Sequence, residues 1–137
     1  MASAYGSDEI WDVFDDSVVR IRVGDQTWIT YGVDACPYPE PLFGVTGWNP
    51  GEERPIDDNE RANARLAERL RAEGIEHVDA VGSAPDHSWS EPGFVLIDTD
   101  RATALRLARE FGQLAIHEMT RGRLGVVKTG ITAPDPQ

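Results

Sequence analysis

The residues most suited to chemistry are three asparagines in the stretch TGWNPGEERPIDDNERANARL, residues 46–66. Asn59 and Asn63 are four residues apart, so they share one face if this region is helical. Asn49 precedes them in a short loop. A carboxamide both donates and accepts hydrogen bonds, and the start of a helix adds free N–H groups with partial positive charge. The spacing therefore predicts a site for a small polar or anionic ligand.

Neighbouring side chains extend this candidate site. Trp48 directly precedes the first asparagine, and Arg61 and Arg65 lie on the same predicted helix. The same pattern also has a structural explanation, because asparagine side chains commonly bond loop backbone and hold a turn in place. From the sequence, the asparagines either bind a ligand or bind the loop.

A second candidate is the segment APDHSWSEPG, residues 84–93, which holds His87 and Glu91. Such a pair can act as acid and base, or supply two metal ligands. Two ligands do not complete a zinc site, so we expect no metal. Glu91 opens a strand that is expected to be buried, and its carboxylate either tethers nearby N–H groups or contacts a ligand.

Other sites of chemistry are not indicated by the sequence. The single cysteine, Cys36, excludes an internal disulfide and a cysteine-based metal cluster. The segment GVTGWNPG lacks the lysine and the spacing of a phosphate-binding loop. No serine has the surroundings of a nucleophile elbow. We therefore expect no cofactor.

A strand over 42–48 and a helix over 58–73 must position the asparagines. The strand LFGVTGW is short, apolar and flanked by residues that break strands, which is typical of a buried strand. Apolar residues recur along the helix at four-residue spacing and predict a buried stripe: Ala62, Leu66 and Leu70. Because the loop between strand and helix is short, Asn49 is expected near the start of the helix.

The remaining elements predict an α+β fold. They comprise a hairpin over 17–33, strands over 76–83 and 94–99, a second helix that starts at Thr99 or Asp100 and stops at Gly112, and a hairpin over 114–130. From residue 42 the order is that of a ferredoxin-like, split βαβ sandwich. We therefore expect an antiparallel or mixed sheet with both helices on one face, preceded by the first hairpin.

Composition and charge narrow the class of partner. A hydrophobic content of 40% and a charged content of 27% are typical of a soluble globular protein. Residues 1–60 hold thirteen carboxylates and three arginines, so they carry most of the net charge of −11. Such a field repels nucleic acids and anionic membranes. It favours either solubility alone or a basic protein partner.

The sequence predicts one domain with short extensions. Residues 1–16 form an acidic arm, residues 17–130 the domain, and residues 131–137 a loose tail. The N-terminus lacks the basic and apolar regions of a secretory signal, and no apolar run approaches the roughly 20 residues that span a bilayer. A cytoplasmic location is expected; the oligomeric state is left open.

Four motifs resemble an uncharacterised bacterial family, domain of unknown function 3293 (DUF3293): VTGWNP, DDNERANARLAERL, HSWSEPGFVLI and AREFGQLAIHE. They cover roughly residues 42–119. The resemblance implies that the family pattern includes Asn49, Pro50, Asn59, Asn63, Glu91 and Gln113. It also implies that serine is more usual than Gly93 after Glu-Pro. The family brings no established activity.

These observations favour a non-enzymatic binding or regulatory domain. Its expected ligand site gathers Trp48, Asn49, Asn59, Asn63, Glu91 and Gln113. The first alternative is an enzyme that acts on a small polar metabolite, with Glu91 as base and His87 as partner. The second is a protein–protein interaction module that uses the acidic N-terminal part.

Overall fold

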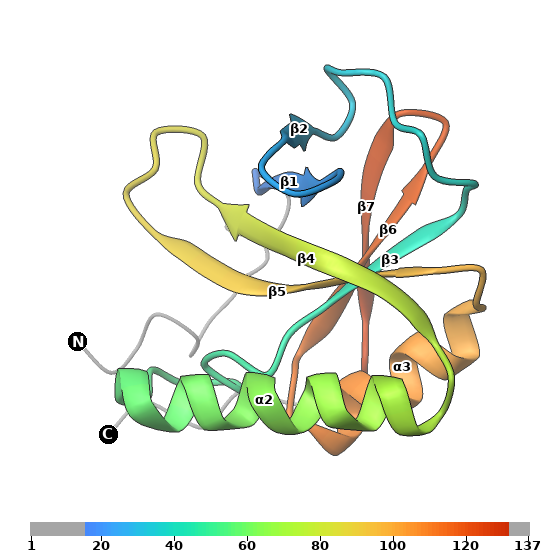
Figure 1. Ribbon diagram of the computed structural model, residues 1–137. Helices are drawn as coiled ribbons and strands as arrows, with labels where there is room; N and C mark the ends of the chain where they lie inside the picture. Colours follow the sequence, from blue (N-terminus) through green and yellow to red (C-terminus); the bar gives the residue numbers. More distant parts are fainter. Residues whose placement is uncertain (1–15, 132–137) are drawn as a thin grey trace.

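Every named strand joins one antiparallel sheet in the computed structural model, which describes residues 16–131. The elements are β1 (Val18–Arg22), β2 (Trp28–Thr30), β3 (Leu42–Val45), α2 (Ile56–Ala72), β4 (Glu76–Ser83), β5 (Ser90–Ile97), α3 (Arg101–Glu110), β6 (Ala115–Thr120) and β7 (Arg123–Lys128). The strand order is β2-β1-β4-β5-β3-β6-β7. The sheet curls into a half-barrel above the two helices (Figure 1).

The N-terminal hairpin is present and extends the sheet. β1 pairs with β2 in antiparallel register, and its other side pairs with β4. Val19 and Ile21 are buried, whereas Arg20 and Arg22 between and after them are less so, as the alternation predicts. Gly24 adopts a φ of 87°, which the turn between the strands requires.

The helix α2 buries the predicted stripe together with Asn59. Ala62, Leu66 and Leu70 are buried at four-residue spacing. The helix starts at Ile56, two residues earlier than expected, because the carbonyl of Pro55 already accepts the N–H of Asn59 at 3.1 Å; Pro55 provides no side-chain cap.

The second helix, α3, begins as predicted at a capping aspartate. The carboxylate of Asp100 accepts the N–H of Thr103 at 2.8 Å, so one free donor of the first turn is satisfied. Phe111 follows the helix, and Gly112 ends it with a φ of 71°. After Gly112 the chain therefore turns back toward the sheet and enters β6.

The strand β5 begins earlier than expected, at Ser90, and takes Glu91 and Pro92 into the sheet. Both residues pair with β4, but β3 reaches β5 only as far as Phe94. One side of the strand is thus open at Pro92, where a proline lacking its N–H is tolerated. The free carbonyl of Pro92 becomes an anchor for the loop that follows β3.

The prediction of a ferredoxin-like sandwich is wrong. A sandwich has helices on one face and leaves the other face to solvent, but here both faces of the sheet are buried. Phe43 and Leu96 belong to a core shared with α2 and α3. Leu42, Val95 and Ile97 belong to a second core, and none of its members within residues 16–131 lies in α2 or α3.

The physical reason for this second core is the length of the sheet. Each added strand increases the accumulated twist, so the seven strands wrap around their own inner face. The β1–β2 hairpin and the residues after it then cover that face, with Ile21 and Tyr31 among the buried contributors.

The predicted arm and tail, residues 1–16 and 131–137, lie outside the described residues except for Asp16 and Ile131. Neither helix within residues 16–131 is long and apolar enough to cross a membrane.

Candidate functional site

Asn59 is the centre of a hydrogen-bonded cluster at the start of α2. Its Oδ1 accepts the backbone N–H of Asn49 at 2.8 Å, and its Nδ2 donates to Asn49 Oδ1 at 2.8 Å and to the carbonyl of Arg54 at 3.2 Å. The side chain is only 2% exposed. Three hydrogen bonds therefore hold both ends of the short loop against the helix.

Asn63, one turn further along α2, binds the beginning of the same loop. Its Oδ1 accepts the N–H of Gly47 at 2.7 Å, and its Nδ2 donates to the carbonyl of Pro92 at 2.9 Å. That carbonyl also accepts the hydroxyl of Thr46 at 2.6 Å, and the same hydroxyl accepts the N–H of Trp48 at 2.9 Å. The loop is thereby tied to α2 and β5 together.

The remaining predicted site residues make further hydrogen bonds that hold the same loop. Asn49 has a φ of 44°, and its Nδ2 donates to Glu91 Oε2 on β5 at 3.2 Å. Gln113, just after α3, donates from Nε2 to the backbone carbonyl of Trp48 at 3.1 Å. The structure thus brings all six predicted residues to one loop, where much of their hydrogen bonding is directed at backbone.

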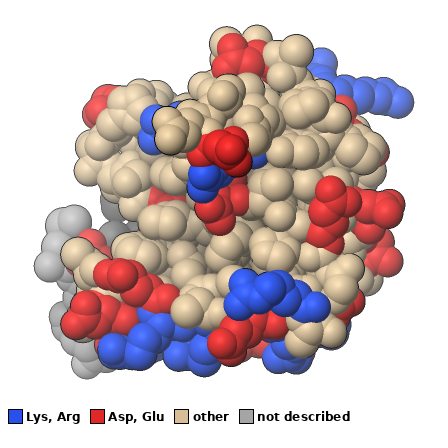
Figure 2. Space-filling view, viewed as in Figure 1, with Lys and Arg blue, Asp and Glu red and all other residues tan. Residues whose placement is uncertain are grey.

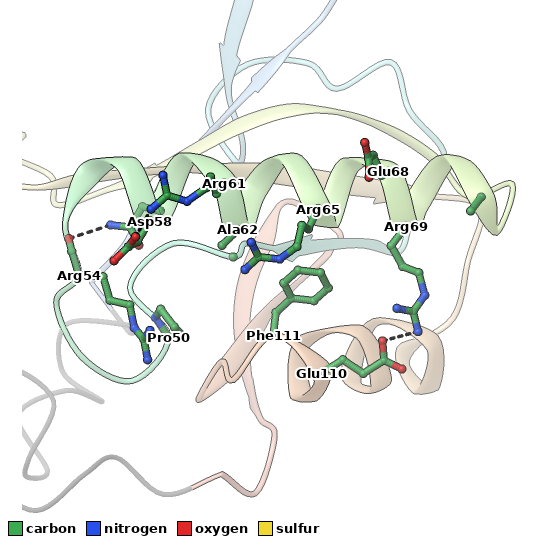
Figure 3. Close-up of a pocket in the computed structure, with 13 residues that line it drawn as sticks. Pro50, Arg54, Asp58, Arg61, Ala62, Arg65, Glu68, Arg69, Glu110 and Phe111 are labelled. Carbon is green, nitrogen blue, oxygen red and sulfur yellow. Dashed lines mark hydrogen bonds and ion pairs between the residues drawn. The ribbon is translucent and has the colours of Figure 1, made fainter.

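A groove of about 800 Å³ runs along α2 beside this loop and the end of α3. Of the six predicted residues, Asn59 alone lines it; Gly47 and Pro50 contribute the loop wall, and Phe111 contributes the wall from the end of α3. Figure 3 shows Pro50 and Phe111 on one side of α2. The carboxamide cluster therefore shapes one wall of a groove that it scarcely enters.

Arginine is the most frequent residue type among the side chains that line the groove. Four arginines line it, against three carboxylates: Arg54, Arg61, Arg65 and Arg69, with Asp58, Glu68 and Glu110. In Figure 2 basic side chains gather along the lower edge of the molecule, over α2, with acidic side chains among them. The lining has a small positive excess on a chain whose net charge is −11.

Three of these arginines are paired with carboxylates. Arg61 pairs with Asp58. Arg54 lies 3.3 Å from Glu52. Arg69 lies 2.8 Å from Glu73 and 2.6 Å from Glu110.

Arg65 differs from them, since no hydrogen bond or ion pair to its side chain is formed within residues 16–131. Figure 3 shows the side chain of Arg65 on the same side of α2 as Phe111, whereas Glu68 points the opposite way. The groove therefore holds one arginine whose donors are uncommitted.

The sequence indicated Arg61 and Arg65 as additional contacts, but not Arg54, Arg69 or Phe111. The signal for Arg69 was present, because Arg61, Arg65 and Arg69 recur every four residues on one helix face. Phe111 carries no such signal, since its place opposite α2 depends on how α3 packs.

His87 lies away from the groove. Its side chain is exposed, its φ is 60°, and it occupies the turn between β4 and β5. Next to it, hydrogen bonds from Ser88 lower the pKa of Asp86. Within residues 16–131, no group of three or more His, Cys, Asp or Glu side chains is arranged to hold a metal ion.

A second, smaller hollow of about 480 Å³ lies where the segment after β2 meets the turn between β6 and β7. The hydroxyl of Tyr31 donates to Glu40 and accepts the N–H of Gly122 at 3.0 Å, while Glu40 also accepts the N–H of Arg121 at 2.8 Å. Burial and the carboxylate beside it raise the pKa of Tyr31 to about 12. The hydrogen bond from Tyr31 lowers the pKa of Glu40.

The comparison with protein families concerns the groove-forming part of the chain. The family model described as "Protein of unknown function (DUF3293)" matches residues 45–116, more than half of the chain. The chain belongs to the DUF3293 family. The DUF3293 match includes the loop after β3, α2, and α3 with Phe111, whereas the Tyr31–Glu40 hollow lies outside it. No curated protein and no solved structure matches this chain.

The DUF3293 resemblance also marked Gly93 as a departure, and the structure shows what glycine permits there. A Cβ at this position would lie 2.8 Å from the Cβ of Thr46 and 2.8 Å from the carbonyl oxygen of Val45. In this chain a serine at residue 93 would therefore require β3 to move.

Proposed function

We propose that this protein is a non-enzymatic binding domain that holds a small anionic ligand in the α2 groove. The single observation that carries the proposal is Arg65, an arginine in the groove without a carboxylate partner among the described residues. A guanidinium presents several N–H donors in a plane and is always charged, so it suits a carboxylate or a phosphate.

The surroundings of Arg65 support the same ligand charge. Arg61 and Arg69 lie one helical turn to either side, so each contributes positive potential even though it is paired. Ala62 and Phe111 also line the groove, so an anion at Arg65 would lie beside apolar carbon as well as beside the positive charge. The groove volume of about 800 Å³ lies in the range of small-molecule sites.

In this proposal the carboxamides are positioning residues. Asn59 and Asn63 hold the loop that carries Gly47 and Pro50 to the groove wall. Asn59 is the member of the cluster that a ligand at Arg65 would also approach, because it lines the groove. The proposed ligand thus binds beside the carboxamide cluster rather than replacing its hydrogen bonds.

The test is anion binding by variants of α2. We expect Arg65→Gln to weaken binding of a simple carboxylate or phosphate by about 10- to 100-fold, the effect of losing a charged hydrogen bond of about 1.5–3 kcal/mol. Arg71→Gln is the matched control, since Arg71 is exposed on the same helix and does not line the groove. Thermal shift and calorimetry at constant ionic strength provide the readout.

Two outcomes would overturn the proposal. The first is an absence of binding by the wild-type protein across benzoate, 2-naphthoate, acetate and inorganic phosphate. The second is an equal loss of binding in Arg65→Gln and Arg71→Gln, because that would indicate attraction to the general field of the helix.

A further inference from the structure

Resting on the proposed function, we infer the class of the ligand: a single anionic group attached to a flat apolar body, as in an aromatic carboxylate. The inference rests on how many cations in the groove are free, on the wall beside Arg65, and on the size of the space.

Three of the four arginines that line the groove are paired with carboxylates, and Arg65 has no such partner within residues 16–131. We therefore expect the ligand to carry a single anionic group. A second anionic group would have to compete with a carboxylate of the protein at Arg54, Arg61 or Arg69. The partners of Arg69 are held firmly, since Arg106 lies 2.5 Å from Glu73 and 3.5 Å from Glu110. This four-membered network joins α2 to α3, so an anionic group that displaced the partners of Arg69 would break a contact between the two helices.

The wall beside Arg65 favours an apolar body on the ligand. Phe111 packs against the helix-side core and is partly buried, so its ring is fixed in place. Figure 3 shows Arg65 on the same side of α2 as this ring. A flat aromatic group can lie against both, because guanidinium planes and aromatic rings each stack well with a π-face.

The loop wall of the groove lies close to the end of α3. A Cβ at Gly112 would lie 3.1 Å from the Cβ of Pro50, so the glycine allows the loop to approach the end of α3 closely. Together Pro50 and Phe111 form an apolar boundary of the groove next to the start of α2. A ligand body placed there would lie beside the apolar carbon of both residues.

Size distinguishes this ligand from an inorganic anion. Acetate or phosphate would fill little of the roughly 800 Å³ and would gain only from the charge of Arg65. An aromatic body would also remove apolar surface from water, which contributes about 25 cal/mol for each Å² buried. Affinity should therefore rise with ring area at constant charge.

The experiment compares probes on the full chain. Wild-type protein is titrated with acetate, benzoate and 2-naphthoate, which share one charge, with benzyl alcohol, which has the ring without the charge, and with inorganic phosphate. We expect at least about tenfold tighter binding of 2-naphthoate than of acetate. Benzyl alcohol and phosphate should bind more weakly than benzoate.

Variants separate the two contributions. Arg65→Gln should weaken every carboxylate, whereas Phe111→Leu should weaken 2-naphthoate and leave acetate unchanged. If Phe111→Leu lowers the unfolding midpoint, Pro50→Ala tests the loop wall with the same expectation.

The outcomes tell the two claims apart. If acetate or phosphate binds as tightly as 2-naphthoate and Arg65→Gln abolishes that binding, the anion site stands and the inferred ligand class is wrong. If no probe binds to the wild-type protein, the proposed function itself fails. If benzyl alcohol binds as tightly as benzoate, the groove is an apolar site and both claims fail.

Discussion

A buried carboxamide such as Asn59 is stable only if its polar atoms find partners. Here Oδ1 and Nδ2 together make three hydrogen bonds to the loop that precedes α2. Desolvation of the amide is thereby offset, and the backbone groups that it binds are satisfied at the same time. One side chain thus serves the helix and the loop.

Replacing this residue should cost much of the stability of the loop. We expect Asn59→Ala to lower the free energy of unfolding by about 2–4 kcal/mol, because three part-buried hydrogen bonds are lost and each contributes about 0.5–1.5 kcal/mol. Urea denaturation measures the loss. Glu60→Ala, exposed on the next position of the helix, is the control and should change little. A loss shared equally by both variants would contradict this account.

The spacing of residues predicted part of the site. Asn59 and Asn63 lie on one helix face, and Asn49 lies near them, because both facts follow from local geometry and a short loop. The position of Phe111 could not be predicted in the same way. It depends on the packing of α3 beside α2, and no spacing along the chain encodes that relation.

At the scale of elements, the contact between β3 and β5 depends on a missing side chain. Gly93 stands where β3 departs from β5, and Thr46 occupies the space beside it. That arrangement lets the hydroxyl of Thr46 reach the carbonyl of Pro92 at 2.6 Å. The strand pairing and the start of the loop are therefore set by the same small residue.

Two glycine variants test this point. Gly93→Ala should lower the free energy of unfolding by about 1–3 kcal/mol, as is typical when a methyl group is forced into a packed space. Gly82→Ala is the matched control on the neighbouring strand β4, since nothing lies within 4 Å of a Cβ there. Guanidinium denaturation of both variants gives the comparison. Equal stability of the two would show that β3 yields to the added methyl group.

At the scale of the whole molecule, the Tyr31–Glu40 contact closes one end of the half-barrel. It joins the segment between β2 and β3 to the turn between β6 and β7, near opposite ends of the strand order. Gly32 supports the approach, because a Cβ there would lie 2.8 Å from the carbonyl oxygen of Gly122. The contact therefore keeps the curl of the sheet fixed.

This contact should make stability fall at alkaline pH. The pKa of Tyr31 is raised from 10.0 to about 12, so folding favours the protonated phenol. Its contribution is complete below pH 10 and is lost as the pH rises toward 12. We expect Tyr31→Phe to be less stable at pH 7 by about 1–2 kcal/mol, and to lose less stability than wild type between pH 10 and 12. Denaturant unfolding across this pH range tests both; parallel curves would contradict the assignment.

The elements were predictable, whereas their arrangement was not. Local patterns located the strands 76–83 and 123–128 and the two helices to within a few residues. The ferredoxin-like sandwich was wrong because the apolar runs in β3 and β5 indicate burial but do not reveal what covers each face. The second core forms from the curl of seven strands, which is a property of the assembled sheet.

The loop that follows β3 is fixed by residues 10, 42 and 65 positions away along the chain, in α2, in β5 and just after α3. Opening it therefore requires separate regions of the protein to release it together. Its amide hydrogens should exchange with solvent through cooperative opening of those regions rather than by local fraying. A molecule bound in the adjoining groove would consequently slow exchange at sites remote from its own contacts, including the paired strands.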